Sequence, residues 1–328
     1  MKLCASATLH ETLAAVLLSC VGGVAFAADA NVEVVLKNLN RPCGIAMRPG
    51  GTADRFDVFI AESGAGRVAR WSTHSPQQVT EVVNGFGTHT AADVFHQQGP
   101  LALTFLDPGL LVVGTTSNDR GDLLRAYELP DGDKVLAADA TSEAASGNKA
   151  LRGESCAAMS RSRVNEFVTD RLFLAVRDAN GRARLMSSRV QAGMLGEPQA
   201  FGSLDAEPPR AITISNSGRV VVGDAAGKLT FFSPIDGKVE LAVPTDLKQL
   251  IGLAYNPSSG SLYAADFAGG IHRIDDASQP GHPECRTVKV ADVSHPTALA
   301  FAPDGSLYVV TYGSAEANGT LSVITGEL

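Results

Sequence analysis

The sequence has no run of lysine or arginine, and its 27 basic residues are outnumbered by 35 acidic ones, which gives a formal net charge of −8. Binding to a nucleic acid depends on clustered basic side chains that neutralise phosphates. We therefore expect no nucleic-acid partner. Charged residues make up only 19% of the chain and hydrophobic residues 45%, a composition that excludes extensive disorder, collagen and coiled coils.

Motifs of several common enzyme classes are also missing. No segment matches a phosphate-binding glycine-rich loop, the nucleophile turn of an α/β hydrolase or the helix of a zinc protease. No amphipathic segment after residue 27 is long enough for a convincing helix. In contrast, 33 glycines and 16 prolines supply many turn signals. The sequence therefore predicts an architecture more clearly than an activity.

The first 27 residues have the parts of a cleavable secretory signal. Lys2 precedes an apolar run from Leu13 to Phe26, and small residues stand three and one positions before a cut after Ala27. The run of about 14 residues is shorter than the roughly 20 that a membrane-spanning helix needs. We expect a secreted or periplasmic protein with no membrane insertion after cleavage. The alternative is lipoprotein processing at Cys20, which would anchor the chain through an acylated cysteine.

Six later segments of the chain share one pattern. Each opens with a small residue, proline or glycine and continues as an apolar strand, a glycine-containing turn, a second apolar strand, a short polar turn and a third strand. The segments start near residues 42, 100, 156, 209, 251 and 296, a period of about 50. Short strands at 78–83, 238–243 and 286–290 supply a fourth strand to their units. Four antiparallel strands at this period are typical of the blades of a β-propeller.

The last repeat predicts how such a ring closes. Its third strand ends at Ile324 and almost no chain follows, so its fourth strand has to be Val32–Leu36, which leaves no open edge. We predict an all-β fold, a single six-bladed β-propeller domain over residues 28–328, closed by pairing of this N-terminal strand with the last blade. The polar segment 131–148 is predicted to be a long surface loop that tolerates insertions.

Three cysteines, Cys43, Cys156 and Cys285, follow the predicted signal. An odd number in an oxidising compartment leaves at least one free thiol or one intermolecular bond. Cys43 and Cys156 belong to the first and third blades, so a direct bond between them is not expected. We predict buried apolar cysteines without a bridge.

The repeats resemble those of a known group of proteins. Residues 42–68 and the segment LAFAPDGSLYVV at 299–310 are similar to NHL-type repeats and to the wider six-bladed superfamily that includes the senescence-marker-protein/gluconolactonase-like hydrolases. The resemblance implies the propeller fold for essentially all of the chain after residue 27. For the hydrolases it also implies a metal held by a glutamate at the opening of the first blade, with Asn and Asp from other blades. This chain has Arg41 and Pro42 at that opening, and Asn216 and Asn256 fall in turns on the opposite face.

Candidate ligand-binding residues follow from the strand directions. The first strand of a blade starts, and the second strand ends, on the same face, because the two strands are antiparallel. The candidates at the channel mouth are Arg41, Glu62, Arg210, Asp224, Asp266 and His295. The same rim is predicted to hold Thr115, Glu154, Arg177, Asp178 and Thr311. Such a ring could hold a cation such as Ca²⁺ through carboxylates, or bind a carboxylate or sugar acid through arginines. The alternative is structural, with each acid capping the turn after its strand and each arginine pairing with an acid of the next blade.

A second candidate site lies in the loop 84–98. His89, Asp93 and His96 are spaced so that they could share one face of a helical turn and meet a metal. A third strong ligand is missing nearby, which favours a solvated connection between blades. No further metal site is predicted.

These observations favour a binding protein over an enzyme. Our leading hypothesis is an exported, monomeric, non-catalytic propeller that recognises a small anionic or carbohydrate ligand, or a protein partner, at the channel mouth. The alternative is a calcium-dependent lactonase of the gluconolactonase type. A quinone-dependent sugar dehydrogenase is a weaker analogy, because no rim base flanked by several cation ligands is visible. A structural module in a cell-surface assembly is the third possibility.

Overall fold

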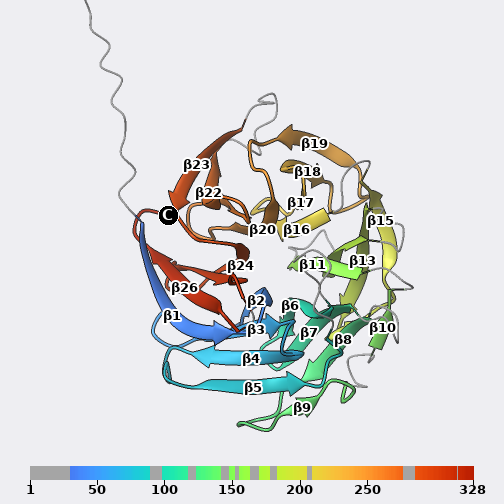
Figure 1. Cartoon of the computed structure of the whole chain (residues 1–328). Helices are drawn as coiled ribbons and strands as arrows, with labels where there is room; N and C mark the ends of the chain where they lie inside the picture. Colours follow the sequence, from blue (N-terminus) through green and yellow to red (C-terminus); the bar gives the residue numbers. More distant parts are fainter. Residues whose placement is uncertain are drawn as a thin grey trace, which may run out of the picture.

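The protein is a ring of six antiparallel β-sheets, as seen in a computed structural model (Figure 1). The structure describes residues 30–88, 98–116, 123–141, 148–151, 155–162, 170–177, 183–204, 209–275, 285–315 and 317–328. Within these residues no helix is long and apolar enough to cross a membrane. The prediction of a signal at residues 1–27 lies outside the described residues.

Each blade starts with the strand nearest the channel and continues outward. The first blade consists of β2 (Pro42–Met47), β3 (Asp57–Glu62), β4 (Arg67–Ser72) and β5 (Val79–Asn84). The second consists of β6 (Gly99–Asp107), β7 (Leu110–Thr116), β8 (Leu123–Glu128) and β10 (Asn148–Ala150). The third consists of β11 (Ser155–Ser162), β12 (Arg171–Arg177), β13 (Ala183–Gln191) and β15 (Gln199–Ser203), with β14 (Met194–Leu195) also paired to β13. The fourth blade consists of β16 (Pro209–Ile214), β17 (Val220–Asp224), β18 (Lys228–Phe232) and β19 (Val239–Pro244). The fifth consists of β20 (Leu250–Tyr255), β21 (Leu262–Asp266), β22 (Gly270–Asp275) and β23 (Arg286–Ala291). The sixth consists of β24 (Pro296–Phe301), β25 (Leu307–Thr311), β26 (Gly319–Thr325) and β1 (Asn31–Leu39). The predicted six-bladed propeller is confirmed.

The ring closes between the last blade and the first, as the sequence predicts. Strand β1 pairs antiparallel with β26, with Val32 opposite Ile324 and Val34 opposite Ser322. The chain then enters β2 of the first blade, so one continuous segment belongs to both blades. A second link lies at the channel, where the Thr297 hydroxyl donates to the Pro42 carbonyl across 2.8 Å. Closure therefore joins the two blades at both the outer and the inner end of the sheet.

The cores lie between neighbouring blades, because each sheet is covered on both faces. All five residues of β25 are buried, and alternate residues contact opposite neighbours. Val309 packs with Tyr263 and Leu299 towards the fifth blade, whereas Val310 packs with Ile60 towards the first. Burial of a Val, Leu or Ile side chain contributes about 1.5–3 kcal/mol relative to exposure, so these interfaces stabilise the ring.

The segment 131–148 differs from the predicted free surface loop. Its described part contains a short strand, β9 (Leu136–Ala137), which pairs in parallel with β5 of the first blade. The Ala138 amide donates to the Asn84 carbonyl at 2.7 Å, and the Ala138 carbonyl accepts from Arg125 and Tyr127. The physical reason is that β5 would otherwise present an unpaired edge. Insertion at residues 136–138 would therefore disrupt a contact between two blades.

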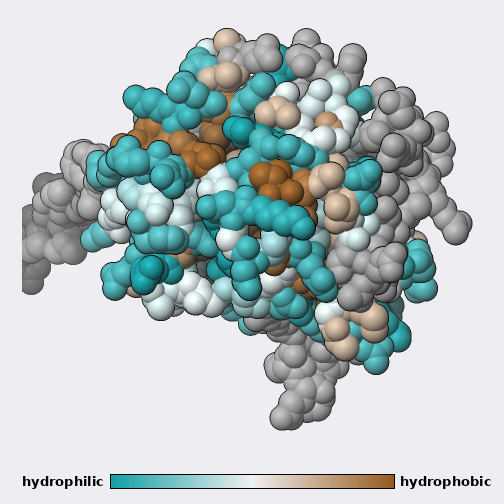
Figure 2. All heavy atoms as spheres, turned by 90° about the horizontal axis from the view of Figure 1, so that it is seen from below, coloured by the Kyte–Doolittle hydropathy of each residue, from teal (hydrophilic) through white to brown (hydrophobic). Residues whose placement is uncertain are grey.

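The outer surface of the ring carries apolar residues on several blades. On the side shown in Figure 2, apolar side chains form separate patches among hydrophilic ones. Exposed large hydrophobic residues lie on several blades, for example Val32, Val79, Met194 and Ile235. Cys43, Cys156 and Cys285 form no disulfide. Cys156 is buried, but Cys43 and Cys285 are partly exposed, so the prediction of buried cysteines is wrong for these two, which lie at the channel mouth and at the start of an outer strand.

Candidate functional site

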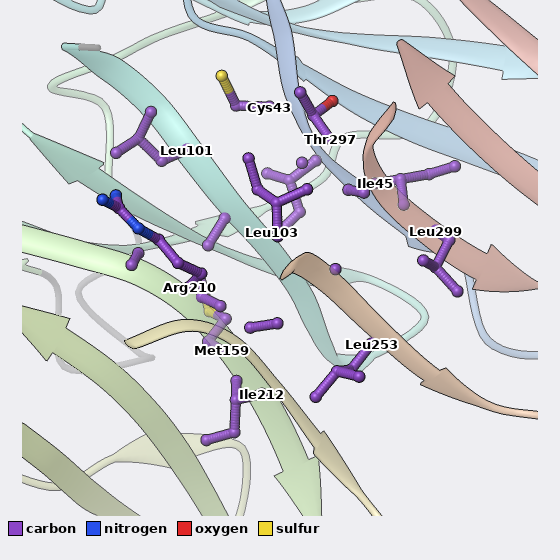
Figure 3. Close-up of a pocket in the computed structure, with 18 residues that line it drawn as sticks. Cys43, Ile45, Leu101, Leu103, Met159, Arg210, Ile212, Leu253, Thr297 and Leu299 are labelled. Carbon is purple, nitrogen blue, oxygen red and sulfur yellow. The ribbon is translucent and has the colours of Figure 1, made fainter. Parts of the chain in front are cut away.

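A β-bulge near the start of every first strand builds the mouth of the channel. In each blade the register skips one residue of the first strand, and the skipped residue has no direct partner in the second strand. The six bulge residues are Cys43, Leu101, Ala157, Arg210, Ile251 and Thr297. A bulge re-aims the local side chain, and all six residues line the central cavity (Figure 3). Arg210 therefore belongs to this inner ring.

Below the bulge residues the channel is narrow and apolar. The next layer consists of small residues, Gly44, Ala102, Ala158, Ala211, Gly252 and Ala298, and the layer after it of large ones, Ile45, Leu103, Met159, Ile212, Leu253 and Leu299. A Cβ added to Gly44 would lie 2.5 Å from the Leu101 carbonyl oxygen. The cavity has a volume of about 90 Å³, whereas small-molecule sites usually have about 300–1,000 Å³. A ligand of sugar size has to bind at the mouth.

In the first, fifth and sixth blades, two further positions form the lip of this mouth, outside the bulge residues. The residue after the second strand donates its amide to the carbonyl of the residue before the first strand. This bond joins Ser63 to Arg41 at 3.2 Å, Phe267 to Gln249 at 2.9 Å and Tyr312 to His295 at 2.9 Å. The fold thus brings Arg41 and His295 to equivalent places in adjacent blades.

The lip side chains of the fifth, sixth and first blades form a continuous arc, which we call the lip arc: Phe267, His295, Tyr312 and Arg41. The Phe267 ring lies 4.9 Å from the His295 ring and 6.3 Å from the Tyr312 ring, centroid to centroid. The Arg41 guanidinium lies 5.7 Å from the centre of the Tyr312 ring. All four residues are half-buried. The lip arc therefore combines one permanent cation, an imidazole and two aromatic faces.

The backbone at the lip is strained at Arg41 and at His295. Arg41 and His295 have φ angles of 49° and 50°, in the left-handed region, and each is followed by a proline. Such conformations cost about 1–3 kcal/mol each and persist only when their surroundings enforce them. At Arg41 the enforcing contacts include the Ser63 hydroxyl, which donates to the Arg41 carbonyl at 2.7 Å.

The three predicted acids lie at the second-strand ends and accept hydrogen bonds from the backbone. Glu62 accepts from the Asn40 amide at 2.7 Å and from Arg67 Nε at 2.5 Å. Asp224 accepts from the amides of Ala226 and Lys228 at 3.0 and 2.9 Å.

Asp266 makes the same type of contacts in the fifth blade. Its oxygens accept from the amides of Gln249, Ala268 and Lys248 at 3.0, 3.1 and 3.2 Å. All three carboxylates are at most 6% exposed. They hold the turn after the second strand or the segment before the first strand, as the structural alternative describes.

The corresponding rim positions in the remaining blades are uncharged. Thr115 and Thr311 occupy them in the second and sixth blades, and both are buried. In the third blade this register position falls on Val176, one residue before Arg177. Glu154, Asp178 and the loop residues His89, Asp93 and His96 lie outside the described residues.

The metal of a gluconolactonase-like site does not fit the described residues. Among them, no three His, Cys, Asp or Glu side chains form a group that could hold a metal ion. The register places Cys43 at the opening of the first blade, and the Asn256 side chain caps a turn on the opposite face by accepting from the Ser258 and Ser259 amides.

Cys43 is a mouth residue that the sequence did not suggest as functional. Its thiol lies 3.2 Å from the Ser63 hydroxyl and 3.5 Å from the Arg41 carbonyl. Burial raises the pKa of this thiol to about 11, although the Ser63 contact and the Arg41 charge act in the opposite direction. The thiol is therefore protonated at neutral pH and is a poor nucleophile.

Sequence reasoning also missed Phe267 and Tyr312. Both come directly after the second-strand residues that were predicted, Asp266 and Thr311. The sequence did contain a signal for both: an aromatic residue follows the second strand in these two neighbouring repeats, whereas a polar or small residue follows it in the other four.

Comparison with known proteins places the fold among β-propellers of diverse function. No family model and no curated protein matches the sequence. A solved structure from Thermus thermophilus, described as an oxidoreductase (glucose dehydrogenase), is 14% identical, with a TM-score of 0.64 over 90% of this chain and 100% of that one. A protein described as a gluconolactonase is 14% identical, with a TM-score of 0.56 over 91% of this chain and 93% of that one. The WD40 propeller domain of Doa1 is 10% identical, with a TM-score of 0.53 over 91% and 98%.

These likenesses establish the fold alone. The chain has the propeller architecture found in the gluconolactonase-like and glucose dehydrogenase proteins, as its repeats indicate. Function has to be argued from the mouth itself.

Proposed function

We propose that the lip arc binds a sugar-derived carboxylate or its lactone, and that the protein hydrolyses the lactone. The observation that carries the proposal is the arc of Arg41, Tyr312, His295 and Phe267 at the mouth of a six-bladed ring. It is supported by two structural neighbours whose descriptions name sugar chemistry, a glucose dehydrogenase and a gluconolactonase. Enzymatic turnover thus replaces non-catalytic binding as our leading hypothesis.

The residues of the lip arc suit both the carboxylate or carbonyl group and the sugar ring of such a ligand. A guanidinium binds a carboxylate or a polarised carbonyl oxygen through charge-assisted hydrogen bonds. The faces of Phe267 and Tyr312 offer apolar surface to the C–H side of a sugar ring. Because the channel below has a volume of only about 90 Å³, the ligand stays at the lip, where the ring oxygen that leaves the carbonyl carbon faces solvent.

Lactone hydrolysis needs an activated water and a group that stabilises charge on the carbonyl oxygen. In our proposal His295 accepts a proton from water as the water oxygen bonds to the carbonyl carbon, and Arg41 stabilises the oxyanion. The bond from the carbonyl carbon to the ring oxygen then breaks, and the ring oxygen takes the proton held by His295 to give the open hydroxy acid. Base catalysis of this kind contributes about 10²–10⁴-fold in rate.

The test compares asparagine variants with wild type. Asparagine tolerates the left-handed backbone of both positions, so His295→Asn and Arg41→Asn should keep the lip intact. Acid release from glucono-1,5-lactone is followed at constant pH with the buffer rate subtracted, and gluconate binding is followed by calorimetry. We expect His295→Asn to lose about 100-fold in rate while still binding gluconate, and Arg41→Asn to bind gluconate at least tenfold more weakly.

Arg55→Asn is the matched control, because Arg55 is exposed in the turn between β2 and β3, on the opposite face. This variant should behave as wild type. A rate for wild type no higher than the buffer rate would rule out hydrolysis.

Non-catalytic recognition of a sugar acid is the second candidate. It is favoured by the engagement of Glu62, Asp224 and Asp266 with backbone amides, which leaves His295 as the base on which turnover depends. Gluconate binding that requires Arg41, without lactone turnover, would support this second function.

A further inference from the structure

A second cavity opens beside His295, between the fifth and sixth blades. Its volume is about 320 Å³, within the range of about 300–1,000 Å³ that is usual for small-molecule sites. One wall is the segment 292–295 between β23 and β24, and the other is the sheet face of β25, β26 and β1. Besides Asp292 and His295, the polar residues that line it carry hydroxyl or amide groups: Ser294, Thr311, Ser314, Asn318, Thr320 and Ser322. We call this cavity the hydroxyl groove.

The register explains why hydroxyls gather here. Thr311 lies opposite Thr320, and their hydroxyl oxygens are 2.8 Å apart. In the first, fourth and fifth blades a carboxylate occupies the position of Thr311. Farther down the same sheet face, Val309 and Ile324 pack into the apolar core between the blades. The interface therefore changes from apolar to hydroxyl-lined where it opens at the mouth.

The chemistry of the groove is that of an uncharged polyhydroxy ligand. Hydroxyl and amide groups can both donate and accept hydrogen bonds, as sugar hydroxyls can. Val32 and Val34, which are 38% and 44% exposed, add an apolar surface for the C–H face of a ring. The carboxylate among the described lining residues, Asp292, is 88% exposed and forms an ion pair with Lys289. Neither the apolar surface of the two valines nor the paired carboxylate of Asp292 favours a charged ligand.

We infer that the hydroxyl groove binds a neutral sugar residue, and that the preferred ligand of the whole mouth is a sugar acid or lactone carrying a second, uncharged sugar. His295 lines the groove and also belongs to the lip arc, so one ligand can occupy both. The acid half of this ligand rests on the proposed function. The neutral half rests on the groove alone.

The test uses three probes: gluconate, lactobionate as an acid carrying a neutral sugar, and lactose as a neutral disaccharide. Calorimetry measures their binding to wild type, to the double variant Thr320→Val/Ser322→Ala, and to Thr80→Val. Val and Ala remove the hydroxyls with little change in shape. Thr80 is a half-buried strand threonine on the outer strand of the first blade, outside the groove, and serves as the matched control.

We expect lactobionate to bind wild type and Thr80→Val about tenfold more tightly than gluconate. The double variant should bind both acids equally, at the gluconate affinity of wild type. The groove does not bind the neutral sugar if wild type binds lactobionate no more tightly than gluconate. The same conclusion follows if the double variant still binds lactobionate more tightly than gluconate. The proposed function is judged separately by gluconate: if no acid binds but lactose binds in a manner that needs Thr320 and Ser322, the groove stands and the proposed function fails.

Discussion

Replacement of Glu62 by glutamine tests whether the acid at the mouth is structural. The Glu62 side chain is 0% exposed and accepts from the Asn40 amide at 2.7 Å and from Arg67 Nε at 2.5 Å. Although partial burial disfavours the charge of Arg67, its bonds to Glu62 and Glu81 raise the pKa of the guanidinium. A hydrogen bond to a charged group contributes about 1.5–3 kcal/mol. A glutamine oxygen can still accept from Asn40, but its NH₂ group then faces the Arg67 donor.

We expect Glu62→Gln to lower the free energy of unfolding by about 2 kcal/mol. An unfolding entropy of about 2.1 cal/mol/K per residue converts this loss to about 3 °C in Tm for a chain of roughly 300 residues. The assay is guanidinium unfolding followed by fluorescence of Trp71, the single tryptophan, which is buried between the first and last blades.

Two comparisons complete this experiment. Asp133→Asn is the control, because Asp133 is 76% exposed in its ion pair with Arg70 and exposed pairs contribute at most about 1 kcal/mol. Gluconate affinity should change less than threefold in Glu62→Gln. A variant that unfolds at the wild-type midpoint but no longer binds gluconate would refute the structural role and place Glu62 in the ligand site.

Three further predictions concern the ring and its channel. Deletion of residues 31–36 uncovers the edge of β26 beside the buried Leu321, so we expect aggregation in light scattering and a lower unfolding midpoint. Gly44→Ala brings a Cβ within 2.5 Å of a backbone oxygen and should cost about 1–3 kcal/mol in the Trp71 assay, whereas Gly87→Ala, with no atom within 4 Å of the added Cβ, should be nearly neutral. Burial raises the pKa of the Cys43 thiol from 9.0 to about 11; since the folded state favours the protonated form, this stabilisation is complete below pH 9 and is lost as the pH rises to 11. Cys43→Ser should remove that part of the alkaline stability loss, and an unchanged pH profile would contradict the burial of the thiol.

The strands were predictable because each combines a local apolar pattern with turn residues at both ends. The first strands start at residues 42, 99, 155, 209, 250 and 296, within one residue of the predicted starts. The closing strand was predictable by exclusion, since it was the remaining unassigned strand. In contrast, β9 has two residues and is formed by the edge of another blade, so no local pattern could reveal it.

The side chains at the mouth were only partly predictable. The sequence places Arg41 and Arg210 at the same rim, but Arg41 comes one residue before a proline and Arg210 one residue after. That offset of two positions puts Arg41 in the lip and Arg210 in the bulge layer. The lip itself depends on the turn after the second strand, and the alignment of strand ends stopped one residue short of Phe267 and Tyr312.

What the mouth can recognise depends on which groups line its opening and on how the carboxylates there are engaged. A carboxylate at a second-strand end can ligate a cation only if its oxygens point away from the backbone, and Glu62, Asp224 and Asp266 each accept two or three hydrogen bonds from neighbouring groups. Thr311, at the same position in the sixth blade, carries no charge; its hydroxyl accepts from the Thr320 amide at 3.1 Å and lies at the wall of the hydroxyl groove. Negative charge is therefore committed to structure, while cations, aromatic faces and hydroxyls line the opening, which favours a ligand that is anionic at one end and polyhydroxylated at the other. If Asp224→Asn and Asp266→Asn abolish gluconate binding while both variants stay folded, and Arg41→Asn leaves it unchanged, this division of roles is wrong.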